Sequence, residues 1–173
     1  VLSLSDFSLA DSGRQYAVGL AIRNALKSGG FKVVYQPIVR TSDGKIVSAE
    51  ALVRLSSPEL GPVPPGEFIP IAEQNGSIHE IGMHVAREAC RTLGRLRNEG
   101  LELEYIEINL SAAQSVDTGI VGRLRDLARE FELGPADICL ELTESAAHNS
   151  PVLMKRNLCE LYNAGFRIAI DDF

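Results

Sequence analysis

Five oxygen-bearing side chains lie in or directly after segments that have the composition of β-strands. They are Glu50, Asn109, Glu141 and the adjacent pair Asp171 and Asp172. Asn109, Glu141 and Asp171 follow one another at about 30 residues, which is the length of one strand–helix–strand repeat. Neighbouring parallel strands end at the same edge of a sheet, so we expect these side chains to converge there.

Four carboxylates in one place repel one another unless a cation neutralises them. Oxygen ligands without Cys or His select Mg²⁺, Mn²⁺ or Ca²⁺ rather than zinc. Two adjacent aspartates together with ligands from other strands could hold two metal ions, an arrangement that promotes in-line phosphoryl displacement by an activated water. The alternative is that each carboxylate caps a helix or pairs with a nearby arginine.

The elements that would position these residues follow from hydrophobic patterning. Residues 31–39 and 45–55 are rich in β-branched residues and flank Asp43-Gly44, which predicts an antiparallel hairpin. After a Pro-rich loop, apolar residues recur at helical spacing up to Gly100. Further strands are expected at 105–111, 138–145 and 166–173, separated by helices at 118–131 and 152–164.

Strands that alternate with helices predict an α/β fold with a parallel sheet, either open and doubly wound or part of a (β/α)8 barrel. No Gly-rich phosphate loop follows a strand, which disfavours a dinucleotide-binding fold. The first 30 residues differ from the rest. Val1–Gly13 is rich in Ser and Asp, and Arg14–Lys27 has helical composition and ends at Ser28-Gly29-Gly30. We therefore expect residues 1–30 to be a linker and lead-in helix, and residues 31–173 to form the main domain.

Composition excludes several classes of protein. The chain has 173 residues, 45 % of them hydrophobic and 23 % charged, with a net charge of −6. The acidic balance without a basic stripe argues against binding of DNA or RNA. Three cysteines without a CxxC pair indicate reduced thiols. No apolar run is long enough for a membrane span and the start carries no signal-peptide pattern, so we expect a cytoplasmic segment without membrane contact.

Glu50-Ala51-Leu52 resembles the signature of the EAL-domain family of cyclic di-GMP phosphodiesterases. The resemblance extends over residues 31–173 in the order of the family. The matching segments are YQPI (35–38), Pro65 with FIPIAE (68–73), INLS (108–111), ELTES (141–145) and IDDF (170–173). Six ordered motifs are far more specific than the tripeptide alone.

The resemblance implies a role for each matching residue. It implies metal ligation by Glu50, Asn109, Glu141, Asp171 and Asp172, with Asp172 also orienting the nucleophilic water. It implies that Arg54 grips a substrate phosphate, that Gln36 and Leu52 contact the nucleotide, and that Glu144 holds the loop after the DDF segment. The implied reaction is hydrolysis of cyclic di-GMP to linear pGpG in bacterial signalling, with Mg²⁺ or Mn²⁺ at a site where Ca²⁺ binds and inhibits.

Two departures from the family pattern stand out. Leu55 replaces the usual Trp after the phosphate-binding Arg, and the sequence stops at Phe173, before the family's remaining strands. We therefore expect a partial (β/α)8 barrel with an antiparallel first strand, truncated after about five strands and taken from a larger protein. On its own, this segment is expected to have at most trace activity.

Three functional hypotheses remain at this stage. The first is a phosphodiesterase, with an additional signalling domain upstream and a possible homodimer. The second is an inactive EAL-type domain that acts as a cyclic di-GMP receptor or a protein-interaction module. The third, an unrelated Mg²⁺-dependent barrel lyase, lacks a Lys or His base at a strand end.

Overall fold

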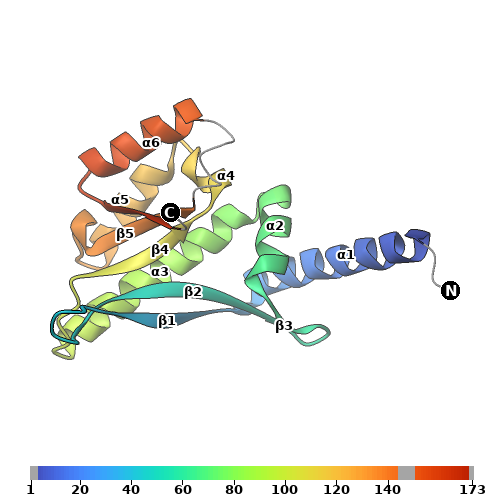
Figure 1. The fold of residues 1–173 in the computed structure, drawn as a ribbon, viewed down its shortest axis with the longest axis horizontal. Coiled ribbons are helices and arrows are strands. Elements are labelled where there is room, and N and C mark those ends of the chain that lie inside the picture. Colours follow the sequence, from blue (N-terminus) through green and yellow to red (C-terminus); the bar gives the residue numbers. More distant parts are fainter. Residues whose placement is uncertain (1–3, 144–150, 172–173) are drawn as a thin grey trace. The chain divides into compact units, whose positions relative to one another are not determined.

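The computed structural model describes residues 4–143 and 151–171. Helices and strands alternate over most of this range (Figure 1). The helices are α1 (Leu4–Ser28), α2 (Pro65–Asn75), α3 (Ile78–Asn98), α4 (Ala112–Ser115), α5 (Ile120–Glu130) and α6 (Pro151–Asn163), with a 3₁₀ turn η1 (Pro135–Asp137). The strands are β1 (Phe31–Val39), β2 (Ile46–Ser57), β3 (Gly61–Val63), β4 (Tyr105–Leu110), β5 (Ile138–Thr143) and β6 (Arg167–Asp171).

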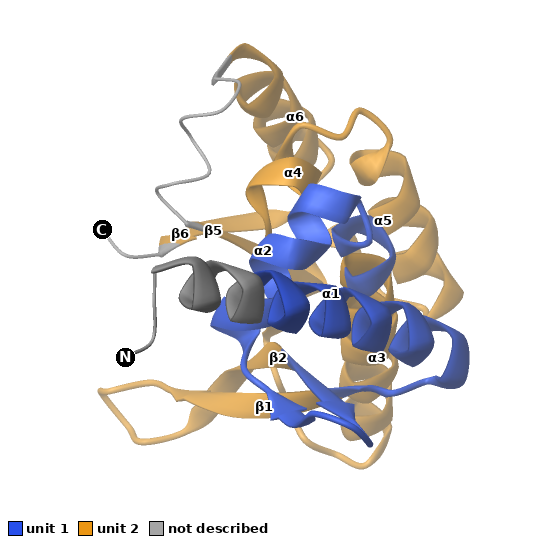
Figure 2. Cartoon of the chain, turned by 90° about the vertical axis from the view of Figure 1, so that its right-hand side faces the viewer, with its two compact units in different colours: residues 1–32, 53–81 blue, residues 33–52, 82–173 orange. Residues whose placement is uncertain are grey.

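The chain divides into two compact units, which Figure 2 shows in different colours. Unit 1 comprises residues 1–32 and 53–81. In it α1 packs on α2: the Arg14 guanidinium donates from Nε and Nη2 to the two carboxylate oxygens of Glu67, at 2.6 and 3.1 Å. The Phe31 and Phe68 rings meet at 5.9 Å and form part of the buried core of this unit.

Unit 2 comprises residues 33–52 and 82–173 and contains the sheet that matters for the site. The strand order is β1-β2-β4-β5-β6, with β3 paired to the far end of β2. The β1–β2 pair is antiparallel, and the β2–β4, β4–β5 and β5–β6 pairs are parallel. The structure therefore confirms the expected mixed sheet, antiparallel at β1–β2 and parallel over the rest.

One face of the parallel strands is apolar and buried. Ile106, Ile108, Ile138 and Leu140 are at most 3 % exposed. The helices of this unit contribute the facing residues, which include Val85, Leu93, Leu124, Leu127 and Leu161. Figure 1 shows α5 and α6 next to the strands β5 and β6. Burial of this face provides most of the hydrophobic stabilisation of the unit, and it leaves the other face of the sheet for polar residues.

The hairpin turn and the helix ends form where the sequence predicts them. Gly44 adopts a φ of 71°, which a side chain would disfavour, and the Arg40 and Lys45 backbones close the hairpin at 2.8 Å. Helix α1 ends at Ser28 and is followed by Gly29 with a φ of 73°.

Three elements differ from the prediction. Helix α1 begins at Leu4 rather than near Arg14, because no Gly or Pro interrupts residues 4–12 and an established helix extends at little cost. The loop expected at 58–65 contains the short strand β3, whose Val63 pairs with Leu55. The short helix α4 follows β4 directly and was not predicted. Residues 144–145 and 172–173, expected to end two strands, lie outside the described residues.

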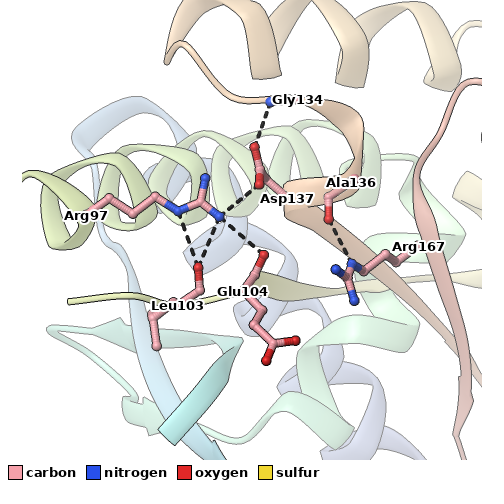
Figure 3. A network of polar contacts seen from close by, with 7 residues as sticks. All are labelled: Arg97, Leu103, Glu104, Gly134, Ala136, Asp137 and Arg167. Atoms are coloured by element: carbon pink, nitrogen blue, oxygen red, sulfur yellow. Dashed lines mark hydrogen bonds and ion pairs between the residues drawn. The ribbon is translucent and has the colours of Figure 1, made fainter. Parts of the chain in front are cut away.

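Arg97 joins three segments at the start of the parallel strands (Figure 3). Its Nη2 donates to the carbonyl oxygens of Leu103 and Glu104, at 3.0 and 3.2 Å, and to the Asp137 carboxylate at 2.8 Å. The Gly134 N–H also donates to Asp137, at 2.7 Å. Burial raises the pKa of Asp137, but the hydrogen bonds from Arg97 and Gly134 outweigh it, so the pKa lies below its usual value.

Replacing Arg97 with Met is expected to destabilise the fold by about 1–2 kcal/mol at pH 7, because charge-assisted hydrogen bonds are lost and the side-chain volume is kept. A carboxyl with a lowered pKa contributes stability above its unfolded pKa of about 3.9, and loses that contribution as the pH falls through the folded value. Urea unfolding at pH 7 and pH 3 should therefore show a smaller difference between wild type and variant at pH 3. An unchanged difference would contradict the role given to Asp137.

In the part of the chain that the structure describes, none of the helices combines the length and apolarity needed to cross a bilayer.

Candidate metal centre

The predicted ligands lie on adjacent strands of unit 2. Glu50 is in β2, Asn109 in β4 and Glu141 in β5, and Asp171 is the last described residue of β6. Glu144 and Asp172 lie outside the described residues. We expected Glu50 near the end of its strand, but β2 continues to Ser57. The pairing of β2 with β4 ends at Ala51, and the rest of β2 pairs with β3.

Strand register places these residues on one face of the sheet. Glu50 is the register partner of Glu107, and Asn109 is the partner of Glu141. Side chains two residues apart on a strand share a face, so these four residues face the same side, opposite the buried isoleucines. The backbone of Asp171 pairs with Thr143, two residues beyond Glu141. The ligand positions therefore advance by two residues from β2 to β4 and again from β5 to β6, whereas those in β4 and β5 lie at the same level.

Glu50 and Asn109 are in direct contact. The Asn109 Nδ2 donates a hydrogen bond to Glu50 Oε1 at 2.6 Å. A carboxylate offers only acceptors, so the amide must turn its NH₂ group toward Glu50, and its carbonyl oxygen Oδ1 points elsewhere. The polar face thus carries the Asn109 amide oxygen and the Glu50 carboxylate, one oxygen of which accepts the bond from Asn109. Both lie beside the register position of Glu141.

The polar face carries a negative electrostatic potential. Burial, together with the charges of Glu107 and Glu141, raises the pKa of the Cys139 thiol to about 12. Burial and the Glu107 charge likewise raise the pKa of Tyr105, whose ring is covered by the Arg167 guanidinium at 4.5 Å. The negative charges of these carboxylates therefore act on the neighbouring side chains. A bound cation would reverse the sign of that local field.

These residues fit a hard divalent cation. Two carboxylates and an amide carbonyl from three adjacent strands are the oxygen donors that Mg²⁺ and Mn²⁺ prefer. Within residues 4–143 and 151–171, no three or more His, Cys, Asp or Glu side chains group closely enough to hold a metal ion. Glu50, Glu141 and the Asn109 amide would therefore contribute part of a ligand set.

The residues predicted to bind substrate have varied environments. Leu52 is half-buried and shares the polar face of β2 with Glu50, while Gln36 is exposed on β1. Arg54 belongs to unit 1 and is exposed; its Nη1 donates to the Val53 carbonyl at 2.9 Å. It forms no ion pair with the described residues, so most of its guanidinium donors remain available for an anion.

Glu107 is a member of the polar face that we did not predict. It is the register partner of Glu50 and raises the pKa of both Tyr105 and Cys139. The alternation Ile106-Glu107-Ile108-Asn109 places Glu107 on the same face as Asn109, so strand periodicity was a sufficient signal.

Replacing Asn109 with Asp is expected to place a second carboxylate beside Glu50 in place of a donor. The mutual repulsion raises the folded pKa of one of the two carboxyls in the variant, so the fold loses about 1 kcal/mol at neutral pH. The loss shrinks as the pH falls through that raised pKa and is gone below the unfolded pKa of about 4. Urea unfolding across this pH range, with and without Mg²⁺, measures the effect, and Mg²⁺ should reduce it. Asn109→Ala is the control, because it removes the donor without adding a charge; equal pH dependence in both variants would refute the explanation.

Comparison with known proteins agrees with this geometry. The family model described as "EAL domain" matches residues 20–173. The chain belongs to the EAL domain family. Among curated relatives, the EAL chain is 37 % identical over 153 residues to the bifunctional diguanylate cyclase/cyclic di-GMP phosphodiesterase MucR of Pseudomonas aeruginosa. It is 34 % identical over 154 residues to the signaling protein YkoW of Bacillus subtilis.

The EAL chain spans a minor part of these relatives. The match covers 88 % of this chain and 22 % of MucR, and 89 % of this chain and 19 % of YkoW. Solved EAL structures have the same fold. The PaMucR phosphodiesterase in its c-di-GMP complex superimposes with a TM-score of 0.84 at 35 % identity, covering 91 % of this chain and 64 % of that chain. The cAMP and cyclic-di-GMP bound form of the EAL enzyme Bd1971 gives 0.82 at 30 % identity, covering 94 % and 45 %.

Proposed function

We propose that the whole protein hydrolyses one phosphodiester bond of cyclic di-GMP with the help of Mg²⁺ or Mn²⁺, giving linear pGpG. The observation that carries this proposal is the cluster on the polar face. The 2.6 Å contact between Asn109 and Glu50 and the adjacent register position of Glu141 gather three of the predicted ligands of this family. Membership of the EAL family supports the choice of substrate.

Glu50, Asn109 and Glu141 would hold the cation, and the Asp171 position at the end of β6 would complete the set. When bound, the divalent cation polarises a phosphate oxygen and makes a water molecule more acidic. Glu50 also fixes the Asn109 amide, so that its carbonyl oxygen faces the ligand side without a search over rotamers. Asp172 would serve a second cation and orient the attacking water.

Substrate recognition would come from further residues that match the family motifs. Arg54 would pair with a phosphate, since its planar fork matches two phosphate oxygens and it makes no ion pair with described residues. Gln36 and Leu52 would contact the nucleotide, and Glu144 would hold the loop after the DDF segment. Ca²⁺ would occupy the centre and inhibit, because it accepts looser and larger coordination than Mg²⁺.

The test is a turnover assay on the whole protein with cyclic di-GMP and Mn²⁺, with chromatographic detection of pGpG. We expect hydrolysis that depends on Mn²⁺ or Mg²⁺ and is suppressed by Ca²⁺. Calorimetry of cyclic di-GMP in the presence of Ca²⁺ separates binding from turnover. Tight binding without turnover in Mn²⁺ would reject the phosphodiesterase in favour of a cyclic di-GMP receptor. Absence of binding would reject both hypotheses.

A further inference from the structure

The turn after β4 folds back on itself directly beyond Asn109. Ser111 begins α4 with a reciprocal cap: its Oγ accepts from the Gln114 N–H at 3.3 Å, and its own N–H donates to Gln114 Oε1 at 3.2 Å. The Gln114 side chain is therefore held against the chain two residues after Asn109. Such a cap satisfies donors that would otherwise be unpaired at the start of the helix and fixes the direction of chain entry.

Helix α3 makes room for Gln114. The Gln114 side chain is 4 % exposed, and a Cβ on Gly82 would lie 1.9 Å from its Nε2 and 2.8 Å from its Cδ. The two residues cannot keep these positions if Gly82 carries any side chain. A glycine inside a helix costs roughly 0.5–1 kcal/mol relative to alanine. Glycine is needed here because the amide of Gln114 packs directly on the backbone of α3.

Helix α6 holds the other end of the same turn. Asn157 is fully buried, and its Nδ2 donates to the carbonyl oxygens of Ser115 and Asp117, at 2.9 and 3.1 Å. The Ser115 N–H donates to the Ser111 carbonyl oxygen at 2.9 Å, which links both ends of α4. The segment after Asn109 is thus fixed from α3 on one side and from α6 on the other.

We propose that Gly82, Gln114 and Asn157 form a brace that sets the position of Asn109, so that the Asn109 amide carbonyl is available to a divalent cation at the polar face. Gly82 and Gln114 are positioning residues, which act through the end of β4 and not by contact with the cation. This role of the brace rests on the proposed function, since a brace for a metal ligand requires that the metal binds. Asn109 is exposed; its side chain is held by the hydrogen bond to Glu50 at 2.6 Å and its backbone pairs with Glu141 in β5. The turn and α4 fix the end of β4 directly beyond it, and so add to the positioning of Asn109.

The experiment compares two single-methyl additions in the same helix of the whole protein. Gly82→Ala places a methyl group against Gln114, whereas the Cβ of Gly94→Ala has only the Phe131 carbonyl oxygen near it, at 3.7 Å. Mn²⁺ affinity is measured by the electron paramagnetic resonance of free Mn²⁺, and stability by thermal unfolding. Gly82→Ala should weaken Mn²⁺ binding at least fivefold and lower kcat by a larger factor than it raises KM. Gly94→Ala should leave Mn²⁺ affinity, kcat and KM unchanged.

Two further variants separate positioning from general destabilisation. Gln114→Ala removes the cap that fixes the turn, and Gly82→Ala/Gln114→Ala also removes the steric conflict. We expect the double variant to regain thermal stability over Gly82→Ala without regaining Mn²⁺ affinity. If stability and affinity recover together, or if every variant binds Mn²⁺ like the wild type, the brace has no positioning role. If the wild-type protein itself binds no Mn²⁺, the proposed function fails and the brace fails with it.

Discussion

Replacing Glu50 with Gln in the whole protein is expected to lower the rate of cyclic di-GMP hydrolysis about a thousandfold, which corresponds to about 4 kcal/mol of transition-state stabilisation. The variant keeps the size of the side chain and an oxygen that can accept from Asn109. It removes the negative charge that Glu50 would contribute to a bound divalent cation. Metal affinity and turnover should therefore fall together while the fold is kept. A chromatographic assay of pGpG and a Mn²⁺ titration measure the two effects.

Glu102→Gln is the matched control, because Glu102 is exposed in the connection between α3 and β4, away from the polar face. The control should retain wild-type rate and Mn²⁺ affinity. Turnover of Glu50→Gln above a tenth of the wild-type rate, with unchanged Mn²⁺ affinity, would show that Glu50 is not a ligand. Circular dichroism of both variants excludes unfolding as the cause.

Replacing Ile106 with Ala is expected to destabilise unit 2 by about 2–5 kcal/mol, because the side chain is fully buried and its removal leaves a cavity among packed neighbours. Ile106 lies between the register positions of Ala49 and Ile138, at the centre of the apolar face. Urea unfolding monitored by circular dichroism provides the measurement.

Ile46→Ala is the control for this core prediction. Ile46 is 51 % exposed at the start of β2, so the same change in volume should cost less than about 1 kcal/mol. Equal losses at the two positions would mean that the helices do not cover the sheet as the structure describes.

Much of unit 2 could be predicted from residue patterns. The strand boundaries of β1 and the pairing of β4 with β5 follow from β-branched runs and from strand–helix–strand spacing, since parallel neighbours need a crossover of this length. Period-two alternation also places Asn109 and Glu141 on the face opposite the buried isoleucines. Composition and spacing alone left open whether the carboxylates form a metal centre or separate caps and ion pairs. The family motifs added the prediction that they are metal ligands.

The features that escaped prediction depend on contacts between distant segments. The strand β3 forms through the pairing of Val63 with Leu55 across the short turn at residues 58–60, and β-propensity alone is a weak guide to such pairing. The cap at Ser111 and Gln114 has a readable sequence signature, but the need for glycine at Gly82 appears only when α3 and α4 meet.

The crowding of acids on one side of the sheet has an evolutionary consequence. Without a counterion, like charges on one face repel one another, so a substitution that neutralises Glu50 or Glu141 would relieve that repulsion while it ended the hydrolysis proposed above. Selection for the proposed activity would therefore act against a gain in stability. Without that selection, a single substitution would remove the activity and keep the folded structure. A domain of this kind would therefore readily become non-catalytic.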